Sequence, residues 1–449
     1  MKHVKLRDCN WIHLDLKGAV PSFEALMNQL QYIRDYGYTG IIFEYEDRLK
    51  WKNWPELARQ PFSRNEHRKL LEYCHDLGLE TVPLIQTLGH LEWILKHEEY
   101  CHLRENNSVS ELCPSVSGVR EKLCRWIAEV LERHPHSRYL HIGGDEPFHL
   151  GTCPVCRKRA EASPYGKYSI YLEHMGEICR FVLERNVRPI IWADLFSRSG
   201  QVNLLSHLPH GVILAEWKYN GKPDVSAIRK MLATGHDVLG CAGICTGYYE
   251  HSQRIEERLD DRFLNINRWK KICSDLKIGR INAVWGRGSG LWEIYSPWHG
   301  HLPVIIHAGN AGLWEKHPWH RFFRKLNTAV LRDRPDELKQ IADTIMQLPA
   351  ASRAEQECLE YWRLALLYQR LVFLLRFEHS QILLLRAMKP YTGEDPMVMK
   401  QCLKQIKDLK SEISQWQESA WNFFHKNDIS DAEEFITGRT GYLRFFLIN

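Results

Sequence analysis

The segment from Tyr139 to Glu146, YLHIGGDE, is an apolar run that ends in two acidic residues. A stretch with helical periodicity, Tyr168 to Arg185, follows it, and a second apolar run, Pro189 to Phe196 (PIIWADLF), comes next. Apolar runs without strict alternation are typical of strands that are covered on both faces, as in a parallel sheet. The order of strand, helix and strand therefore predicts a parallel βαβ unit.

The same pattern occurs eight times in the first two thirds of the chain. The predicted strands are Trp11 to Lys17, Gly40 to Asp47, Glu80 to Thr87, Tyr139 to Glu146, Pro189 to Phe196, Val212 to Tyr219, Asp237 to Ile244 and Ile281 to Arg287. The stretches between them are typical of helices, and Ser63 stands three residues before Glu66, which is the spacing of a capping box. Eight such units predict an α/β fold, a (β/α)8 TIM barrel.

An open doubly wound sheet is the main alternative fold. It usually has a Gly-rich phosphate turn after its first strand, whereas residues 14–19 (LDLKGA) contain one glycine. From about residue 326 the sequence has long helical runs and no strand signals. We therefore expect a catalytic barrel over residues 1–325 and an α-helical C-terminal region over residues 326–449, which packs on the barrel or forms a homodimer contact.

The composition of the 449 residues excludes a wholly disordered, a collagenous or a small disulfide-stapled protein. The apolar fraction of 44% and the charged fraction of 26% are ordinary for a globular protein. The net charge of +5 does not indicate nucleic acid or an anionic membrane as a partner. The 16 tryptophans indicate either a large core or a carbohydrate site in which indole rings face sugar rings.

The N-terminal segment has no apolar run after its basic residues, so we expect no signal peptide. No run of 18 apolar residues occurs, so we expect no membrane span. The 13 cysteines are odd in number and scattered, which indicates reduced thiols and a cytoplasmic location. Cys153 and Cys156 form a CxxC pair, but no second pair follows at finger-like spacing. We therefore expect a tight Pro turn there, with zinc binding or redox activity as the less favoured alternatives, and we expect no cofactor.

Polar and aromatic residues gather at the predicted C-terminal ends of the strands, where TIM barrels hold their active sites. Carboxylates, one histidine and three tryptophans share this rim, and its residues include Asp15, Lys17, Glu44, His90, Asp145, Glu146, Trp192, Asp194, Glu216, Trp217, Tyr219, Trp285 and Arg287. Acidic groups between aromatic walls indicate glycoside hydrolysis, in which two carboxyl groups usually act.

Asp145 and Glu146 are neighbours, which is awkward for carboxyl groups that must flank a sugar from opposite faces, because successive strand residues point to opposite sides. Adjacent carboxyl groups can cooperate in another way. One protonates the leaving oxygen, while the other orients a group of the substrate that acts as the nucleophile. Gly143 and Gly144 just before the pair would let a substrate approach the backbone closely.

The motif HIGGDE at residues 141–146 resembles the signature of glycoside hydrolase family 20, the β-N-acetylhexosaminidases. The segment QTLGH at residues 86–90 is similar to a family segment on strand three, and three tryptophans fall where the family has its indoles. The segments HLDLKGA at 13–19 and EYED at 44–47 resemble most closely the intracellular hexosaminidase D subgroup. The resemblance covers residues 10 to about 310.

The resemblance implies a retaining exo-enzyme that removes terminal β-linked N-acetylglucosamine (GlcNAc), N-acetylgalactosamine (GalNAc) or both. Glu146 would be the general acid and base, with a raised pKa, and Asp145 would hold the acetamido N–H while the acetamido oxygen attacks C1. Other residues would bind the substrate. Trp192, Trp217 and Trp285 would surround the acetamido methyl, Tyr219 (or Tyr248 or Tyr249) would donate to its oxygen, His90 would support the acidic pair, and Asp15, Glu44 and Asp194 are candidates for the sugar hydroxyls.

Two departures from the family pattern leave the choice between GlcNAc and GalNAc open. Lys17 stands where many members have an arginine, and Arg287 follows Trp285-Gly286 where many have a glutamate. A GalNAc-specific enzyme and an inactive carbohydrate-binding barrel are therefore alternatives. A metal-dependent hydrolase that uses His90, His141, Asp194 and Glu216 is disfavoured, because no His-x-His spacing supports it.

Overall fold

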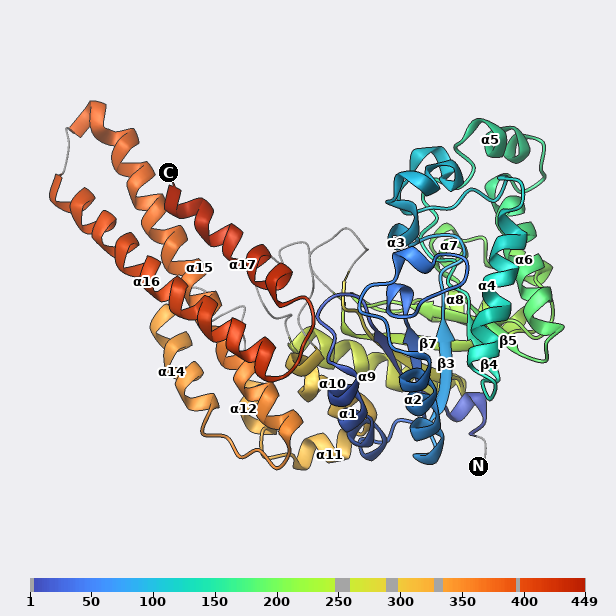
Figure 1. The fold of residues 1–449 in the computed structure, drawn as a ribbon, viewed down its shortest axis with the longest axis horizontal. Coiled ribbons are helices and arrows are strands. Elements are labelled where there is room, and N and C mark those ends of the chain that lie inside the picture. Colours follow the sequence, from blue (N-terminus) through green and yellow to red (C-terminus); the bar gives the residue numbers. More distant parts are fainter. Residues whose placement is uncertain (1–3, 247–258, 288–297, 327–333, 393–395, 449) are drawn as a thin grey trace. The chain divides into compact units, whose positions relative to one another are not determined.

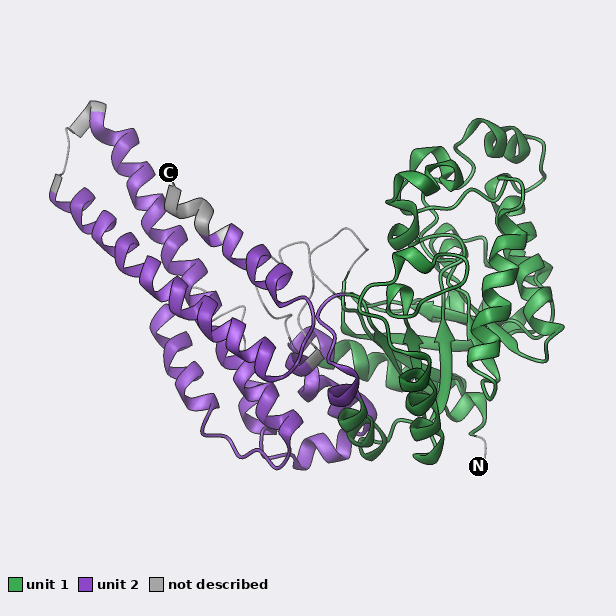
Figure 2. Cartoon of the chain, in the orientation of Figure 1, with its two compact units in different colours: residues 1–17, 27–246, 263–292 green, residues 18–26, 247–262, 293–449 purple. Residues whose placement is uncertain are grey.

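The computed structural model describes residues 4–246, 259–287, 298–326, 334–392 and 396–448. Contacts along the chain group these residues into two compact units (Figure 2). Unit 1 comprises residues 1–17, 27–246 and 263–292, and unit 2 comprises residues 18–26, 247–262 and 293–449. The expected division into a catalytic barrel over residues 1–325 and an α-helical region over residues 326–449 stays a prediction.

Unit 1 is built on a closed barrel of eight parallel strands in chain order, which confirms the predicted fold (Figure 1). The strands are β1 (Asn10–Asp15), β2 (Gly40–Glu44), β3 (Glu80–Leu84), β4 (Tyr139–His141), β5 (Arg188–Trp192), β6 (Ile213–Trp217), β7 (Asp237–Cys245) and β8 (Gly279–Val284). β8 pairs with β1 and closes the barrel, with Trp11 opposite Ile281. Buried apolar side chains from the strands, such as Ile42, Leu84 and Ile213, fill the interior.

Helices follow the strands as the βα pattern predicts. They are α1 (Phe23–Asp35), α2 (Arg64–Asp76), α3 (Glu92–Leu95), α4 (Val119–Arg133), α5 (Pro154–Glu161), α6 (Lys167–Leu183), α7 (Asp194–Ser199), α8 (Val225–Ala233) and α9 (Leu259–Leu276). Short 3-10 helices lie at Leu6–Asp8, Glu46–Arg48, Pro55–Leu57, Glu98–Leu103, Glu105–Asn107 (η5) and Val202–His207. The capping box is present, because Ser63 caps α2 and exchanges hydrogen bonds with Glu66.

The regular elements of unit 2 are helices wherever the structure describes it, as the sequence beyond residue 326 predicts. A 3-10 helix (Trp298–His301) precedes α10 (Leu302–Gly309), α11 (Ala311–Lys316), α12 (His320–Lys325), α14 (Pro335–Ile345), α15 (Arg353–Thr392), α16 (Pro396–Lys426) and α17 (Ala432–Ile448). Buried side chains of α15, α16 and α17 form one core, and the Trp416 indole donates to the Leu364 carbonyl inside it. The early segment 18–26 belongs to this unit, because Val20 donates to the Ser430 hydroxyl.

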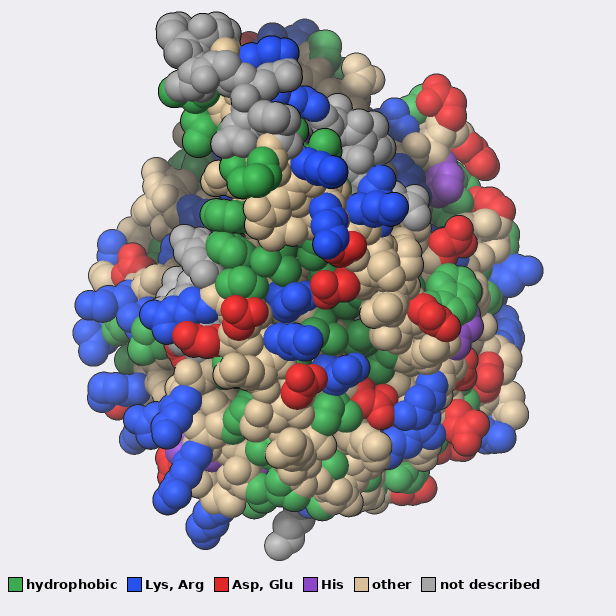
Figure 3. Space-filling model, turned by 90° about the vertical axis from the view of Figure 1, so that its left-hand side faces the viewer, with side chains coloured by type: hydrophobic (Ala, Val, Ile, Leu, Met, Phe, Trp, Pro, Cys, Tyr) green, Lys and Arg blue, Asp and Glu red, His purple; other side chains and the backbone are tan. Residues whose placement is uncertain are grey.

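The long helices of unit 2 also expose hydrophobic side chains. They include Phe377, Leu383, Leu384, Met397, Leu403 and Trp421. Figure 3 shows a face of the molecule on which hydrophobic side chains lie between Lys and Arg side chains. Within the described residues, every helix is too short or too polar to cross a bilayer.

Candidate active site

The acidic pair follows β4 in a segment of unusual backbone conformation. β4 ends at His141, so the alternation of strand side chains does not extend to Asp145 and Glu146. Gly143 and Gly144 have φ angles of 69° and 92°, and Glu146 has a φ of 46°, in the left-handed region that non-glycine residues seldom adopt. This backbone lets two neighbouring carboxyl groups point toward the same site.

The turn before the acidic pair is held by buried polar groups. The Gly143 amide donates to Nδ1 of His141 over 3.1 Å. Burial lowers the pKa of His141 to about 3, so the imidazole is neutral and can accept this bond. A Cβ on Gly143 would lie 1.9 Å from Oε1 of Gln86, so the backbone conformation and the packing both require glycine here.

Asp145 and Glu146 converge on His90. Nε2 of His90 lies 3.4 Å from Oδ2 of Asp145 and 3.5 Å from Oε2 of Glu146. Gly89 permits this approach, because a Cβ there would lie 2.3 Å from the Asp145 carbonyl oxygen. The imidazole thus bridges both carboxyl groups, while Nδ1 of His90 faces Glu92 at 3.8 Å.

The charged groups of this cluster shift one another's pKa values. Burial alone would lower the pKa of His90, but the charge of Asp145 and the hydrogen bonds to the neighbouring carboxylates raise it well above its usual value. Burial alone would raise the pKa of Glu146, but His90 and Arg198 lower it below its usual value. The raised pKa expected for Glu146 is therefore wrong for this structure, because two cationic side chains outweigh the enclosed surroundings.

Arg198 is a site residue that the sequence analysis missed. Its Nη1 donates to Oε1 of Glu146 over 2.9 Å, and its guanidinium lies 4.4 Å from the centre of the Trp217 ring. Arg198 stands four residues after Asp194 on α7, and the two side chains approach to 3.9 Å. The i, i+4 spacing of an acid and a base directly after a strand was the signal that could have indicated it.

Asp194 and Glu216 are buried carboxyl groups beside the pair. Oδ2 of Asp194 accepts the Glu146 amide over 3.3 Å and so supports its left-handed backbone. Burial, with the nearby charge of Asp145, raises the pKa of Asp194 from 3.8 to about 7. Burial also raises the pKa of Glu216 to about 8, and its Oε1 accepts a hydrogen bond from Ser197.

A second charged network lies at the ends of β1 and β2, around Lys17. Its Nζ lies 3.1 Å from Asp15, 3.1 Å from Glu44 and 3.4 Å from Glu46. Oε2 of Glu44 also lies 3.0 Å from Nε2 of His13. Burial would raise the pKa of Glu44, but Lys17 and His13 lower it, so Glu44 is a carboxylate. Protein groups thus already surround Asp15 and Glu44, two of the three acids that were expected at the sugar hydroxyls.

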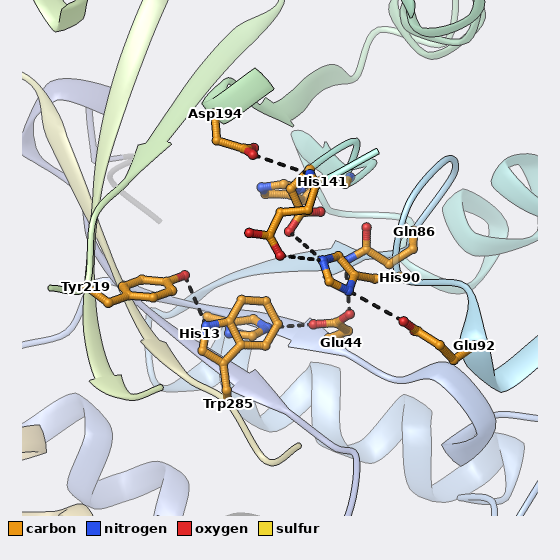
Figure 4. Close-up of polar contacts among 12 residues, drawn as sticks. His13, Glu44, Gln86, His90, Glu92, His141, Asp194, Tyr219 and Trp285 are labelled. Atoms are coloured by element: carbon orange, nitrogen blue, oxygen red, sulfur yellow. Dashed lines mark hydrogen bonds and ion pairs between the residues drawn. The ribbon is translucent and has the colours of Figure 1, made fainter. Parts of the chain in front are cut away.

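The predicted aromatic residues divide into two groups. Trp217 stacks on Tyr219 with ring centres 4.8 Å apart, and the Trp285 indole donates to the Tyr219 hydroxyl over 3.0 Å (Figure 4). Trp192 is only 1% exposed and packs against His141 in the barrel interior. The structure thus brings three of these rings together at the ends of β6 and β8 and places Trp192 deeper in the barrel.

Arg287 follows β8 and is largely buried. Its backbone amide and that of Gly286 donate to Oδ2 of Asp15, over 3.4 Å and 2.9 Å, so Asp15 ties the end of β1 to the end of β8. The alternative tyrosines, Tyr248 and Tyr249, lie outside the described residues.

The residues of the metal-hydrolase alternative do not form a metal centre. Among the described residues, the ligand atoms of His90, His141, Asp194 and Glu216 do not gather at a common point. A cavity of about 770 Å³ lies elsewhere, lined by residues of α2 and α4. It includes Glu80 and Thr81 at the N-terminal end of β3, the opposite end of the barrel from the acidic pair, so the chemistry does not belong there.

Comparison with known proteins identifies the family of the chain. The family model described as glycosyl hydrolase family 20, catalytic domain, matches residues 37–292. Hexosaminidase D of Bos taurus is 29% identical over 305 residues, which are 66% of this chain and 88% of that protein. Hexosaminidase D of Homo sapiens is 33% identical over 312 residues, which are 67% of this chain and 63% of that protein.

A solved structure also shares the fold. The beta-N-acetylhexosaminidase from Bacteroides fragilis has a TM-score of 0.52 and 16% identity, and the match covers 71% of this chain and 72% of that one. The family model spans more than half of the chain, and the barrel is the one expected of such enzymes. The chain belongs to glycosyl hydrolase family 20, and it is a glycoside hydrolase related to the hexosaminidase D subgroup.

Proposed function

We propose that the protein is a retaining exo-β-N-acetylhexosaminidase that removes terminal β-linked GlcNAc, GalNAc or both by substrate-assisted catalysis. The observation that carries the proposal is the convergence of Asp145 and Glu146 on Nε2 of His90, at 3.4 Å and 3.5 Å. Two adjacent carboxyl groups on the same side of a site cannot flank a sugar ring, but they suit a reaction in which the substrate supplies the nucleophile.

In this mechanism the two acids divide the work. Glu146 donates a proton to the leaving oxygen, while the acetamido oxygen attacks C1 and forms an oxazolinium ion. Asp145 accepts the acetamido N–H and stabilises the positive charge that develops. Glu146 then takes a proton from the water that opens the ring, so the product keeps the β configuration.

The pKa shifts of His90 and Glu146 support this division of roles. The raised pKa of His90 keeps a proton between the two carboxylates. Arg198 is one of the two cations that lower the pKa of Glu146. A sugar oxygen that replaced Arg198 as the partner of Glu146 would remove that influence and favour the protonated acid.

The aromatic group at the ends of β6 and β8 supports an acetamido pocket. Trp217, Tyr219 and Trp285 contact one another, and apolar rings with one hydroxyl suit a methyl group beside a carbonyl oxygen. We assign the hydrogen bond to the acetamido oxygen to Tyr219, and the methyl contact to the indoles, Trp192 included. Asp15, Glu44 and Asp194 would either bind the sugar hydroxyls directly or position the protein groups that bind them.

The test is a kinetic comparison of aryl β-glycosides of GlcNAc and GalNAc, with the first-formed product anomer followed by NMR. The proposal expects turnover of at least one substrate with the β anomer formed first. Formation of the α anomer first would contradict retention. Binding of both sugars without turnover would favour the inactive carbohydrate-binding barrel.

A preference for GalNAc is the second candidate, and Arg287 and Lys17 favour it because they depart from the family pattern around the sugar hydroxyls. Arg287→Gln should change the preference between GlcNAc and GalNAc, measured as the ratio of the two kcat/KM values, more than it changes the total activity on the two sugars. An unchanged ratio would exclude Arg287 from sugar selection.

The location and oligomeric state are also proposals. We place the enzyme in the cytoplasm, because no two cysteines of the described residues form a disulfide, as in a reducing compartment. The exposed apolar side chains of α15 and α16 support a homodimer through the C-terminal helices. Sedimentation equilibrium would decide between a dimer and a monomer.

A further inference from the structure

Three cysteines and one glutamate meet at a buried point of unit 1, away from the acidic pair. Cys113 lies between β3 and α4, Cys153 caps the N-terminus of α5, Cys156 lies in its first turn, and Glu105 lies in η5. All four side chains are buried, and one ligand atom from each lies within 4.8 Å of the others. The sequence around the CxxC pair predicts a tight Pro turn, and only the structure shows that Cys113 reaches the pair from 40 residues upstream.

The spacing of the sulfur atoms is that of a tetrahedral metal site. Sγ of Cys113 lies 3.6 Å from Sγ of Cys156 and 3.8 Å from Sγ of Cys153. A zinc ion with Zn–S bonds of about 2.3 Å and tetrahedral angles separates its sulfur ligands by about 3.8 Å. A disulfide would hold two of these atoms at about 2.0 Å, so the observed spacing fits a shared ion better than a bond between sulfurs.

Glu105 supplies the fourth ligand atom. Its Oε1 accepts the amides of Thr152 and Cys153, over 3.0 Å and 2.9 Å, which fixes the orientation of the carboxylate. Its Oε2 is fully buried and has no hydrogen-bond partner among the described residues other than the three thiols beside it. A buried carboxylate oxygen is costly without a partner, and a cation at the centre of the cluster would supply one.

The surroundings also suit thiolate ligands. The Cys156 amide donates to Sγ of Cys153 over 3.3 Å, at the N-terminus of α5. The Ser115 hydroxyl lies 3.0 Å from Sγ of Cys156, and Arg159 donates to that hydroxyl over 2.6 Å. These donors and the positive end of the helix offset part of the negative charge of three thiolates and a carboxylate.

We propose that Cys113, Cys153, Cys156 and Glu105 bind one structural Zn²⁺ ion. Binding involves no redox change, since the three thiols lose their protons to solvent as the sulfurs bind the metal. Four protein ligands leave no open position, so the ion is structural and does not activate water. It joins the segment after β3, which carries His90, to the segment after β4, which carries Asp145 and Glu146.

The first experiment measures zinc in the purified full-length protein by plasma mass spectrometry. We expect about one zinc per chain in the wild type. Glu105→Gln and Cys156→Ser should lower the zinc content at least several-fold. Cys101→Ser is the matched control, because Cys101 lies in the same segment but outside the cluster, and it should keep the wild-type content. Zinc below about one tenth of an equivalent in the wild type, or a loss in the control alone, would overturn the proposal.

A second measurement does not depend on how well the cysteine variants fold. Co²⁺ is added under reducing conditions to metal-free wild-type protein, and the absorption of thiolate–cobalt charge transfer is followed. We expect saturation at about one equivalent and displacement by Zn²⁺. Absence of the charge-transfer band would overturn the metal site. Alkylation and mass spectrometry of protein purified without oxidant would show whether a disulfide joins these cysteines. A Cys113–Cys156 or Cys153–Cys156 disulfide would also overturn the metal site and would indicate a redox pair. Neither readout uses glycosidase activity, so the site is tested independently of the proposed function.

Discussion

The guanidinium of Arg198 lies 2.9 Å from the carboxylate of Glu146, and it joins α7, directly after β5, to the acid that follows β4. The same guanidinium faces the Trp217 ring at 4.4 Å. Arg198 is therefore placed to set both the charge of Glu146 and the position of one wall of the aromatic group. This contact makes the protonation of Glu146 sensitive to a residue outside the family signature.

Replacing Arg198 with Gln should raise the pKa of Glu146, because one of the two cations that lower it is removed. A general acid is active while protonated, so the alkaline limb of the kcat/KM profile should move to higher pH. Arg198→Lys keeps the charge and should leave the limb closer to the wild-type position. An alkaline limb that stays in place in Arg198→Gln, or moves to lower pH, would show that Arg198 does not control this acid.

Glu146→Gln should reduce turnover about a hundredfold or more on substrates with poor leaving groups, because these need the proton that Glu146 supplies. The loss should be smaller for a nitrophenyl glycoside, whose leaving group departs without much help. Glu132→Gln is a suitable control, because that side chain is 68% exposed and distant from the site. Equal losses on both kinds of leaving group would contradict an acid role for Glu146.

Lys17→Met should destabilise the protein by about 3–5 kcal/mol, because it leaves buried Asp15, Glu44 and Glu46 without their shared cation. Lys52→Met is the matched control. Its side chain is 60% exposed and pairs with Glu132 at the surface, so a change of about 0–1 kcal/mol is expected. Urea unfolding of both variants measures the difference, and similar losses would contradict a structural role for the Lys17 network.

Asp194→Asn should change how stability depends on pH. The folded pKa of about 7 lies above the ordinary 3.8, so protonation of Asp194 favours the folded state. That contribution is complete below the unfolded value and is lost as the pH rises to about 7. The variant has no such loss, so its Tm relative to wild type should rise between about pH 4 and about pH 7. A Tm difference that is constant over this range, as expected for exposed Asp275→Asn, would refute the raised pKa.

Much of the fold could be predicted because local signals and tertiary structure agree in the barrel. Each of the eight apolar runs overlaps a strand, although β4 ends at His141 and not at Glu146. That earlier end matters for the chemistry, because two adjacent acids can share His90 only outside a regular strand. Glycines at 143 and 144 were the visible sign that the strand stops there.

The features that escaped prediction depend on contacts between distant residues. Cys113 joins the CxxC pair from another loop, and Arg198 reaches across from the next βα unit. The direction of the shift in the Glu146 pKa was predicted wrongly. The aromatic residues of the sequence indicate an enclosed site, but they do not show that His90 and Arg198 lie beside the carboxyl group. Trp192 was grouped with the other indoles by its strand end, and the structure places its side chain deeper, in the barrel interior, so its contact with the acetamido methyl stays a proposal.

The most direct measurement compares aryl β-N-acetylhexosaminides whose acetamido methyl carries zero, one, two or three fluorine atoms. Fluorine withdraws electrons from the amide oxygen, so the rate should fall steeply with each fluorine if that oxygen attacks C1. A rate that is independent of fluorine content would mean that an enzyme carboxylate or water is the nucleophile, and it would contradict the role given to Asp145 and Glu146.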